Sequence, residues 1–361
     1  MLNADTRSSV ISVFKVLFIV ILYIKYKIMI PLYRINGGKT ECLLCPHFCK
    51  LSEGKTGICG VRKNTGGKIE LITYGVISGY SLDPVEKKPL YHFFPGHNIL
   101  SVGSFGCNMK CDFCQNFNIS QKVPEIIKNE MTPEKLVASA LKTERNIGLA
   151  FTYNEPIIWF EFMRDAAIMS KNEGLFNVMV SNGYVNHEPL NEIIQFIDAF
   201  NIDLKAFNND TYRKLTGVSM DPVRKGLKQI AESGKHLEIT SLIITGQNDS
   251  EEEMDKQAEW IAGELGKGVP LHLSRYFPMY RRDDPATKQE TLERLFEIAS
   301  GRLDYVYMGN THSDAGQNTN CPKCGTTVTI RSGYNTKLLN LDKQGKCSEC
   351  GTLIFSHVTF S

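Results

Sequence analysis

The sequence predicts an α/β fold in which parallel strands alternate with covering helices, as a partial βα barrel of about six units. Nearly continuous apolar runs, which are typical of strands buried on both faces, recur between residues 99 and 276. Stretches with helical periodicity separate these runs. Cysteines are grouped before, inside and after this region, so we expect metal-binding modules on both sides of the barrel.

Each element of the predicted barrel has its own signal. Thr132 and Pro133 are an N-cap and a first helical residue ahead of an apolar stretch. The functional groups of such barrels gather at the carboxyl ends of the strands. The strand candidates are 99–102, 149–153, 176–181, 199–204, 237–244 and 271–276. The helix candidates are 136–141, 156–170, 187–197, 222–233, 250–265 and 287–300.

Composition and charge set broad limits on the chain. It has 361 residues, a formal net charge of +2, 42% hydrophobic and 22% charged residues, which is ordinary for a globular protein. This balance gives no reason to expect nucleic acid as a partner. The predicted domains are an apolar N-terminal extension (1–29), a cysteine-rich β module (30–82), the barrel (83–315) and a zinc-ribbon-like module (316–361).

The N-terminal extension leaves three interpretations open. Residues 10–24 are apolar apart from Ser12 and Lys15, but a membrane-spanning helix needs about 20 such residues. The segment is a membrane anchor, a buried or interfacial helix, or an extension that results from a translation start assigned too far upstream. We favour the misassigned start because Met29 directly precedes sequence that looks like a normal N-terminus. Thiolate metal ligands need a reducing compartment, so we expect the protein in the cytoplasm.

The most informative motif is the Cys-x3-Cys-x2-Cys spacing of Cys107, Cys111 and Cys114, directly after the first barrel strand. A [4Fe–4S] cluster normally takes one thiolate on each iron, so three thiolates leave one iron open to bind a small molecule. The alternatives are three core cysteines or a zinc site, but zinc sites usually use two Cys-x2-Cys pairs. The spacing therefore favours a catalytic iron–sulfur cluster.

Polar residues follow successive strands of the predicted barrel. Each alone is weak, since an Asn-Glu-Pro turn is often a helix cap and an Asp-Leu-Lys segment is often a surface ion pair. Together, at the ends of neighbouring strands, they predict one ligand-binding mouth. The candidate cofactor-binding residues are Asn154, Glu155, Ser181, Asn182, Asp203 and Lys205, and candidates for lining the substrate pocket are Tyr153, Tyr184, Arg275 and Tyr276.

Two further cysteine groups flank the barrel. The C-terminal group consists of two Cys-x2-Cys pairs, each followed by glycine. Four thiolates can close a tetrahedron around one ion, so this pattern predicts a structural zinc site, with rubredoxin-like iron or a docking role as alternatives. The N-terminal group leaves zinc, an auxiliary iron–sulfur cluster and merely buried thiols open. The C-terminal ligands are Cys321, Cys324, Cys347 and Cys350, and the N-terminal group is Cys42, Cys45, Cys49 and Cys59.

With these motifs the chain resembles the radical SAM superfamily, whose members act on S-adenosylmethionine (SAM). Within it the chain is similar to the radical SAM enzymes of the AmmeMemoRadiSam system, homologues of pyruvate formate-lyase activating enzymes. Genes of that group accompany AMMECR1-like and MEMO-like proteins, which makes such proteins candidate partners. The similarity covers the chain from residue 30 onward and is carried by 42–49, 57–62, 83–90, 107–116, 152–156, 181–184, 203–205 and 276–278.

The resemblance implies a fold and roles for particular residues. The fold is the partial TIM-like (βα)6 barrel of the radical SAM type, and the three central cysteines ligate its [4Fe–4S] cluster. Asn154 and Glu155 stand where activating enzymes carry a Gly-Gly-Glu turn that meets the SAM amino group; the acid is present and the glycines are not. Asp203 and Lys205 match an Asp-x-Lys that contacts the SAM amine or ribose and its carboxylate.

The resemblance also implies a reaction. A flavodoxin or ferredoxin supplies one electron, SAM is cleaved to methionine and a 5′-deoxyadenosyl radical, and the radical abstracts hydrogen from an unidentified substrate. An alternative is an activating enzyme that installs a glycyl radical on a partner enzyme. A further alternative is a metal-stapled interaction protein without activity, but a scaffold has no need of an open iron.

Overall fold

The structure is a computed structural model that describes residues 31–124, 131–311, 313 and 315–359. Contacts divide the chain after Leu32; residues 33–361 form one compact unit, and of the unit before it only Pro31 and Leu32 are described. The apolar segment 10–24 lies outside the described residues. No helix in the described part of the chain is long and apolar enough to cross a membrane.

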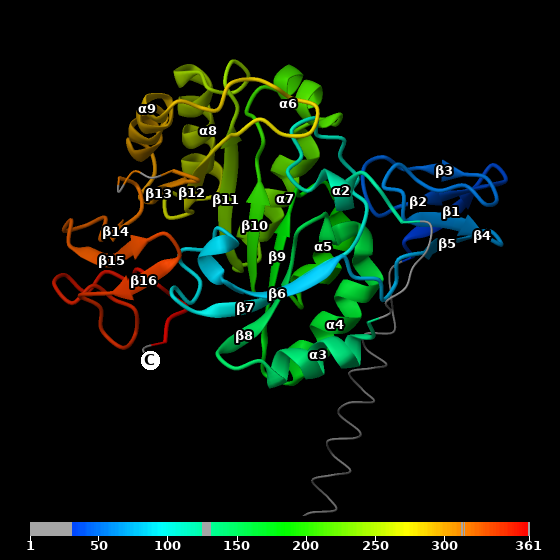
Figure 1. Cartoon of the computed structure of the whole chain (residues 1–361), viewed down its shortest axis with the longest axis horizontal. Helices are drawn as coiled ribbons and strands as arrows, with labels where there is room; N and C mark the ends of the chain where they lie inside the picture. The colour runs from blue at the N-terminus through cyan, green and yellow to red at the C-terminus, as the bar shows by residue number, and fades with distance from the viewer. Residues whose placement is uncertain (1–30, 125–130, 312, 314, 360–361) are drawn as a thin grey trace, which may run out of the picture. The chain divides into compact units, whose positions relative to one another are not determined.

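An eight-stranded sheet forms the centre of the large unit, in the order β13-β12-β11-β10-β9-β8-β7-β6 (Figure 1). Neighbours from β7 to β13 run parallel, and β6 pairs antiparallel with β7. This parallel sheet confirms the predicted α/β fold. Its strands are β6 (Gly79–Pro84), β7 (Asn98–Gly103), β8 (Asn146–Phe151), β9 (Phe176–Ser181), β10 (Ala199–Asp203), β11 (His236–Ile243), β12 (Leu271–Arg275) and β13 (Val306–Gly309).

Helices alternate with these strands and pack against them. Local capping explains where several begin: the Thr132 hydroxyl accepts from the Lys135 N–H, and the Ser250 hydroxyl accepts from the Glu253 N–H. The α-helices are α2 (Phe117–Ser120), α3 (Pro133–Lys142), α4 (Phe160–Asn172), α5 (His187–Ile194), α6 (Asn209–Thr216), α7 (Asp221–Glu232), α8 (Glu251–Glu264) and α9 (Gln289–Ser300). Two 3-10 turns are η1 (Val85–Lys87) and η2 (Pro156–Trp159).

Small antiparallel sheets carry the two flanking cysteine groups. The N-terminal group lies on or beside a three-stranded sheet and a hairpin, and the C-terminal group lies around a second three-stranded sheet. The N-terminal strands are β1 (Tyr33–Asn36), β2 (Lys39–Cys42), β3 (Lys50–Leu51), β4 (Arg62–Thr65) and β5 (Lys68–Leu71). The C-terminal strands are β14 (Thr319–Asn320), β15 (Thr327–Ser332) and β16 (Asn335–Leu338).

The segment that connects β6 to β7 packs against the sheet near the amino-terminal ends of β7, β9 and β10. Its apolar side chains are fully or almost fully buried and pack against residues of four neighbouring strands, which removes them from water. This packing closes one end of the partial barrel, so the carboxyl ends of the strands remain for a site. The cluster is Val85, Leu90, Phe93, Phe94, Ile99, Ala150, Val178 and Ala199.

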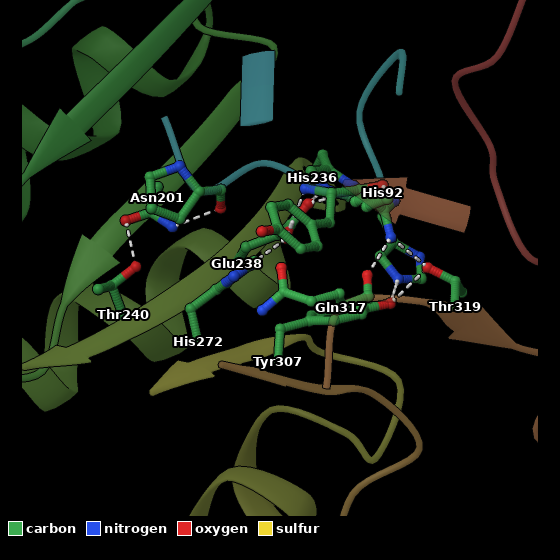
Figure 2. A network of polar contacts seen from close by, with 12 residues as sticks. His92, Asn201, His236, Glu238, Thr240, His272, Tyr307, Gln317 and Thr319 are labelled. Carbon is green, nitrogen blue, oxygen red and sulfur yellow. Dashed lines mark hydrogen bonds and ion pairs between the residues drawn. The ribbon is translucent and has the colours of Figure 1, made fainter. Parts of the chain in front are cut away.

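A fully buried carboxylate, Glu238, ties the same connection to β11 and β12 (Figure 2). It accepts from the backbone N–H groups of Tyr91 and His92 at 3.0 and 2.7 Å. It also accepts from Nε2 of His236 at 2.9 Å and of His272 at 2.6 Å. Burial alone would raise its pKa, but the hydrogen bonds from the two histidines hold the pKa of Glu238 well below its usual range.

His92 continues this network into the C-terminal sheet (Figure 2). Its Nδ1 lies 3.3 Å from the carbonyl oxygen of Ile354, which can only accept, so Nδ1 carries the proton. Its Nε2 then accepts from the Tyr307 hydroxyl at 2.7 Å, and Tyr307 accepts from Thr319. Arg331 donates to Thr319 at 2.8 Å. Each donor in this series points toward His92, so Nε2 of His92 accepts a hydrogen bond and carries no proton. The imidazole is therefore neutral.

The neutral imidazole predicts a pH-dependent stability. Burial lowers the pKa of His92 to about 3, whereas an unfolded chain has a histidine pKa of about 6.5. The stabilisation is complete above the unfolded pKa and is lost as the pH falls toward the folded pKa, because only the unfolded chain takes up the proton. The free energy of unfolding should fall by up to about 1.4 kcal/mol per pH unit in this window from this group.

Denaturant unfolding of wild type and His92→Gln across this pH range measures the effect. The slope should be shallower in the variant, while His187→Gln, at an exposed position, should keep the wild-type slope. Equal slopes for wild type and His92→Gln would contradict a neutral buried imidazole.

Candidate active site

The loop of residues 104–116, here called the cluster loop, leaves the carboxyl end of β7 and carries Cys107, Cys111 and Cys114. All three are free cysteines. The Gly106 N–H donates to the carbonyl of Ile119 at 2.8 Å, which ties the start of the loop to α2. The Met109 N–H lies 3.4 Å from Cys107 Sγ, as a donor to a ligand sulfur would. The loop therefore lies where the sequence predicted it.

Contacts from distant segments hold the rest of the cluster loop. The Lys110 N–H donates to the carbonyl of Thr216 at the end of α6. Arg282 makes an ion pair of 2.9 Å with Asp112, and the Arg281 N–H donates to the Asp112 carbonyl. Sequence reasoning missed these residues, although the charged run 281–284 shortly after a strand was an available signal.

Burial decides the protonation of two cluster-loop thiols, Cys107 and Cys111. The pKa of Cys107 is raised well above its ordinary value, first by burial and then by the negative charge of Glu155. Burial raises the pKa of Cys111 to about 12, although Lys205 opposes the shift. Such thiols carry no free thiolate at neutral pH, and a bound metal would replace the proton. The chemistry of this donor set fits a metal-ligand role better than a free nucleophile.

Asn154 and Glu155 follow β8 and have different roles in the structure. The Asn154 side chain accepts from the Ser104 N–H at 3.0 Å and donates to the Gly106 carbonyl at 3.1 Å, so it clamps the start of the cluster loop. The Glu155 carboxylate is 1% exposed. The predicted contact of either residue with SAM stays a prediction.

Protein donors already occupy both oxygens of Glu155. Oε1 accepts from the Ser181 hydroxyl at 2.7 Å and from the Ile157 N–H at 2.9 Å. Oε2 accepts from the Asn182 N–H at 2.8 Å. Burial raises its pKa to about 7 despite these donors. Glu155 thus joins the carboxyl ends of β8 and β9.

Asn182 brings the end of β9 to the first cluster-loop cysteine. Its Nδ2 lies 3.6 Å from Cys107 Sγ and 2.9 Å from Asn108 Oδ1. Its Oδ1 accepts from the Tyr184 N–H at 2.9 Å, which fixes the orientation of the amide. The structure therefore places Asn182 beside a predicted cluster ligand, and Ser181 one residue away on the Glu155 carboxylate.

Asp203 and Lys205 follow β10 and form an ion pair of 2.9 Å. Lys205 Nζ also lies 5.7 Å from the ring centre of Phe113, which stands between two of the cluster-loop cysteines. Burial would lower the pKa of Lys205, but the Asp203 carboxylate and the Cys111 sulfur hold it above its usual range. An anion and a cation beside the cluster loop match the ammonium and carboxylate of an amino acid.

The four pocket candidates differ in their surroundings. Tyr153 has a positive φ of 73°, a strained conformation of the kind that occurs at functional sites, and its hydroxyl donates to Asp83 at 2.8 Å. Tyr184 is largely buried. Arg275 donates to the Thr287 carbonyl at 2.7 Å and Tyr276 is buried, so both support the chain after β12.

The C-terminal cysteines come together as the spacing predicted. Their four Sγ atoms all lie within 4.8 Å of one another, and no other set among the described residues gathers ligand atoms for a single ion in this way. Two matching turns present them: the Gly325 N–H donates to the Cys321 carbonyl and the Gly351 N–H donates to the Cys347 carbonyl. The N-terminal cysteines instead line one cavity with other residues.

Comparison with known proteins matches residues 101–258 to the radical SAM superfamily. An uncharacterized protein of Methanocaldococcus jannaschii is 40% identical over 326 residues, which cover 89% of this chain and 96% of that protein. The pyruvate formate-lyase 1-activating enzyme of Escherichia coli strain K12 is 23% identical over 206 residues, covering 53% and 83%. A crystal structure of Streptococcus suis SuiB bound to S-adenosylmethionine aligns with a TM-score of 0.48 and 15% identity, covering 63% and 54%.

The chain belongs to the radical SAM superfamily. Membership confirms the resemblance read from the cysteine motif and makes the protein a SAM-dependent enzyme with a [4Fe–4S] cluster. The residues fit that cluster, because one loop supplies three free cysteines, and the raised pKa values of Cys107 and Cys111 leave protons that a metal would displace.

Gly106 is a position in the cluster loop that has no room for a side chain. Its φ is +85°, and a Cβ there would lie 2.4 Å from the Cys59 carbonyl oxygen. We predict that Gly106→Ala displaces the loop and lowers the iron bound after anaerobic reconstitution, because backbone cannot yield as a flexible side chain does. Gly174→Ala is the matched control, since Gly174 has φ +78° but no atom within 4 Å of a new Cβ.

The control should lose only about 1 kcal/mol of stability, the ordinary cost of a positive φ, and should bind as much iron as wild type. Full iron content in Gly106→Ala would contradict the predicted role of this close approach.

Proposed function

We propose that the protein binds SAM beside a [4Fe–4S] cluster held by Cys107, Cys111 and Cys114 and uses it to start a radical reaction on a substrate still to be identified. The observation that carries this proposal is the juxtaposition of the three-cysteine loop with the Asp203–Lys205 pair. When bound, cluster and SAM together supply a one-electron cleavage that yields methionine and a 5′-deoxyadenosyl radical, which takes hydrogen from the substrate.

The side chains around the cluster loop would bind and orient SAM. Lys205 would donate to the SAM carboxylate and Asp203 would accept from its ammonium or ribose hydroxyls, in place of their mutual ion pair. Met109 and Phe113 are buried members of the loop and would exclude water from one side of the site. Asn154 and Asn182 would hold the loop in position through their contacts with Gly106 and Cys107.

A low-potential one-electron donor such as flavodoxin or ferredoxin completes the proposed function. Thiolate ligands favour the reducing cytoplasm. The sequence resemblance supports membership of the AmmeMemoRadiSam system, with AMMECR1-like and MEMO-like proteins as partners. The second candidate function, installation of a glycyl radical on a partner enzyme, is favoured by the relatives named as pyruvate formate-lyase activating enzymes.

The first test is anaerobic turnover with SAM and dithionite, with 5′-deoxyadenosine as the measured product. Cys111→Ala should abolish product and remove the absorbance of the cluster that Cys111 ligates, while the far-UV circular dichroism stays unchanged. Unchanged SAM cleavage in that variant would overturn the proposal. Formation of a protein-based glycyl radical signal on an added glycyl-radical enzyme would favour the second candidate over the first.

The Asp203–Lys205 pair gives a separate prediction on binding. Lys205→Met should weaken SAM binding by roughly 10- to 100-fold, the value of one lost hydrogen bond to a charged group. The readout is titration of the SAM-dependent change in the electron paramagnetic resonance of the reduced cluster. Lys214→Met, whose lysine contacts Gln247 at an exposed position, is the control and should bind SAM as wild type does. Equal affinities in both variants would contradict the role of Lys205.

We also propose that the C-terminal cysteines hold one structural zinc ion. Four thiolates leave no open coordination position, and the sulfurs are already close: 3.4 Å separates Cys321 from Cys350 and 3.6 Å separates Cys324 from Cys347. Cys347→Ala should lose one zinc ion per chain by elemental analysis and should lower the melting temperature. Ser348→Ala, at an exposed neighbour, should keep both. Retention of zinc by Cys347→Ala would contradict this site.

A further inference from the structure

The N-terminal cysteines surround a common space. Cys42, Cys45, Cys49 and Cys59 all line one small cavity, together with His47 and Arg62. The turn that presents them is closed by a hydrogen bond of 3.0 Å from the Cys42 N–H to the Cys49 carbonyl. Cys42 ends β2, Cys45 and Cys49 lie between β2 and β3, and Cys59 lies between β3 and β4. Separate segments thus bring four thiols to one place.

The spacing of these sulfurs differs from that of a single-ion site. A zinc ion with four thiolates holds its sulfurs about 3.8 Å apart, nearly in contact, with no room between them for anything larger than the ion. The C-terminal group has that spacing, and it is the only such set in the described ranges of the chain. The N-terminal cysteines are not such a set, although they line one cavity. A cube of four irons and four sulfides holds its four thiolates farther apart than a single ion does, so it suits this group better.

Hydrogen-bond donors face these sulfurs from the backbone. Burial raises the pKa of Cys59, and the N–H groups of Val61 and Arg62 offset part of that shift by donating to the sulfur. Burial likewise raises the pKa of Cys45 to about 12, and the His47 N–H and the Asn108 side chain donate to it. Donors to the sulfurs stabilise an anionic iron–sulfur cluster and tune its potential.

A buried cation lines the same cavity. The Arg62 side chain is 2% exposed and donates to both oxygens of Glu161 at 2.8 Å. Its Nε is buried and has no hydrogen-bond partner among the described residues. A cluster with four thiolates carries net negative charge, which would meet both the unused donor and the positive charge of the guanidinium.

The cavity lies directly against the cluster loop. Nε2 of His47 donates to the Asn108 carbonyl at 2.7 Å, and the Asn108 side chain also contacts Cys45. Asn108 follows Cys107 in the sequence, so one residue touches both cysteine groups. The close approach of Gly106 to the Cys59 carbonyl is a second direct contact between them.

We infer that Cys42, Cys45, Cys49 and Cys59 hold a second [4Fe–4S] cluster with a thiolate on every iron, placed to relay electrons to the neighbouring cluster. With no open iron it binds no SAM. It accepts one electron from a flavodoxin- or ferredoxin-type donor and passes one electron on; no bond is formed or broken and no proton moves. The relay rests on the function proposed above, whereas the site itself does not.

The first test uses the full-length chain and leaves the four N-terminal cysteines unchanged. A triple variant, Cys107→Ala, Cys111→Ala and Cys114→Ala, removes the other cluster and is reconstituted anaerobically with iron and sulfide. It should retain about four irons and four sulfides per chain, against about eight of each in wild type. After dithionite reduction its electron paramagnetic resonance should not respond to SAM. Absence of iron from this variant, or a second zinc ion in its place, would overturn the inference.

Two single variants complete the test. Cys49→Ser should lower the iron of wild type by about four atoms, while Cys324→Ser should lower zinc and leave iron unchanged. SAM cleavage by Cys49→Ser should fall at least tenfold when reduced flavodoxin is the donor, and much less when dithionite can reach the other cluster directly. Equal losses, or none, with both donors would refute the relay; the metal count of the triple variant would still decide the site.

Discussion

The buried carboxylate of Glu155 is the interaction on which the arrangement of the site depends. A charged or polar group so far from water needs its hydrogen bonds, and here the donors come from its own turn and from the end of the next strand. This requirement fixes the ends of β8 and β9 relative to each other. On one side Asn154 then clamps the cluster loop, and on the other Asn182 reaches Cys107.

The opposite end of the barrel is built for stability. Phe93 and its apolar neighbours fill that end, and Glu238 collects donors from the connection and from two strands. The C-terminal sheet joins this network through Tyr307 and Arg331. Substitutions at this end should therefore change the free energy of unfolding, whereas substitutions at the cluster loop should change cofactor binding.

The three groups of cysteines differ in how their residues are arranged. The C-terminal sulfurs are close enough to share one ion, while the N-terminal sulfurs surround a cavity. The central three occupy a loop held by α6 and by the segment after β12. Contacts of Asn108 with His47 and Cys45 join the N-terminal and central groups, so the N-terminal module forms part of the surroundings of the active site.

The sequence alone determined the parallel α/β fold and the spacing of the cysteine groups. Buried parallel strands are apolar along their whole length, which is why the strand predicted at 176–181 has the bounds of β9, and the spacing of Cys107, Cys111 and Cys114 lies within one loop. The sequence analysis did not predict β6, half of whose residues are exposed, or the short polar helix α6, because neither has an apolar pattern.

Tertiary structure alone decided where the side chains of the site point. Glu155 is turned onto the end of β9, Asn182 reaches a cysteine 75 residues earlier in the chain, and the four N-terminal cysteines line one cavity. Distances between residues far apart in sequence follow from the packing of strands and loops, and no local spacing encodes them.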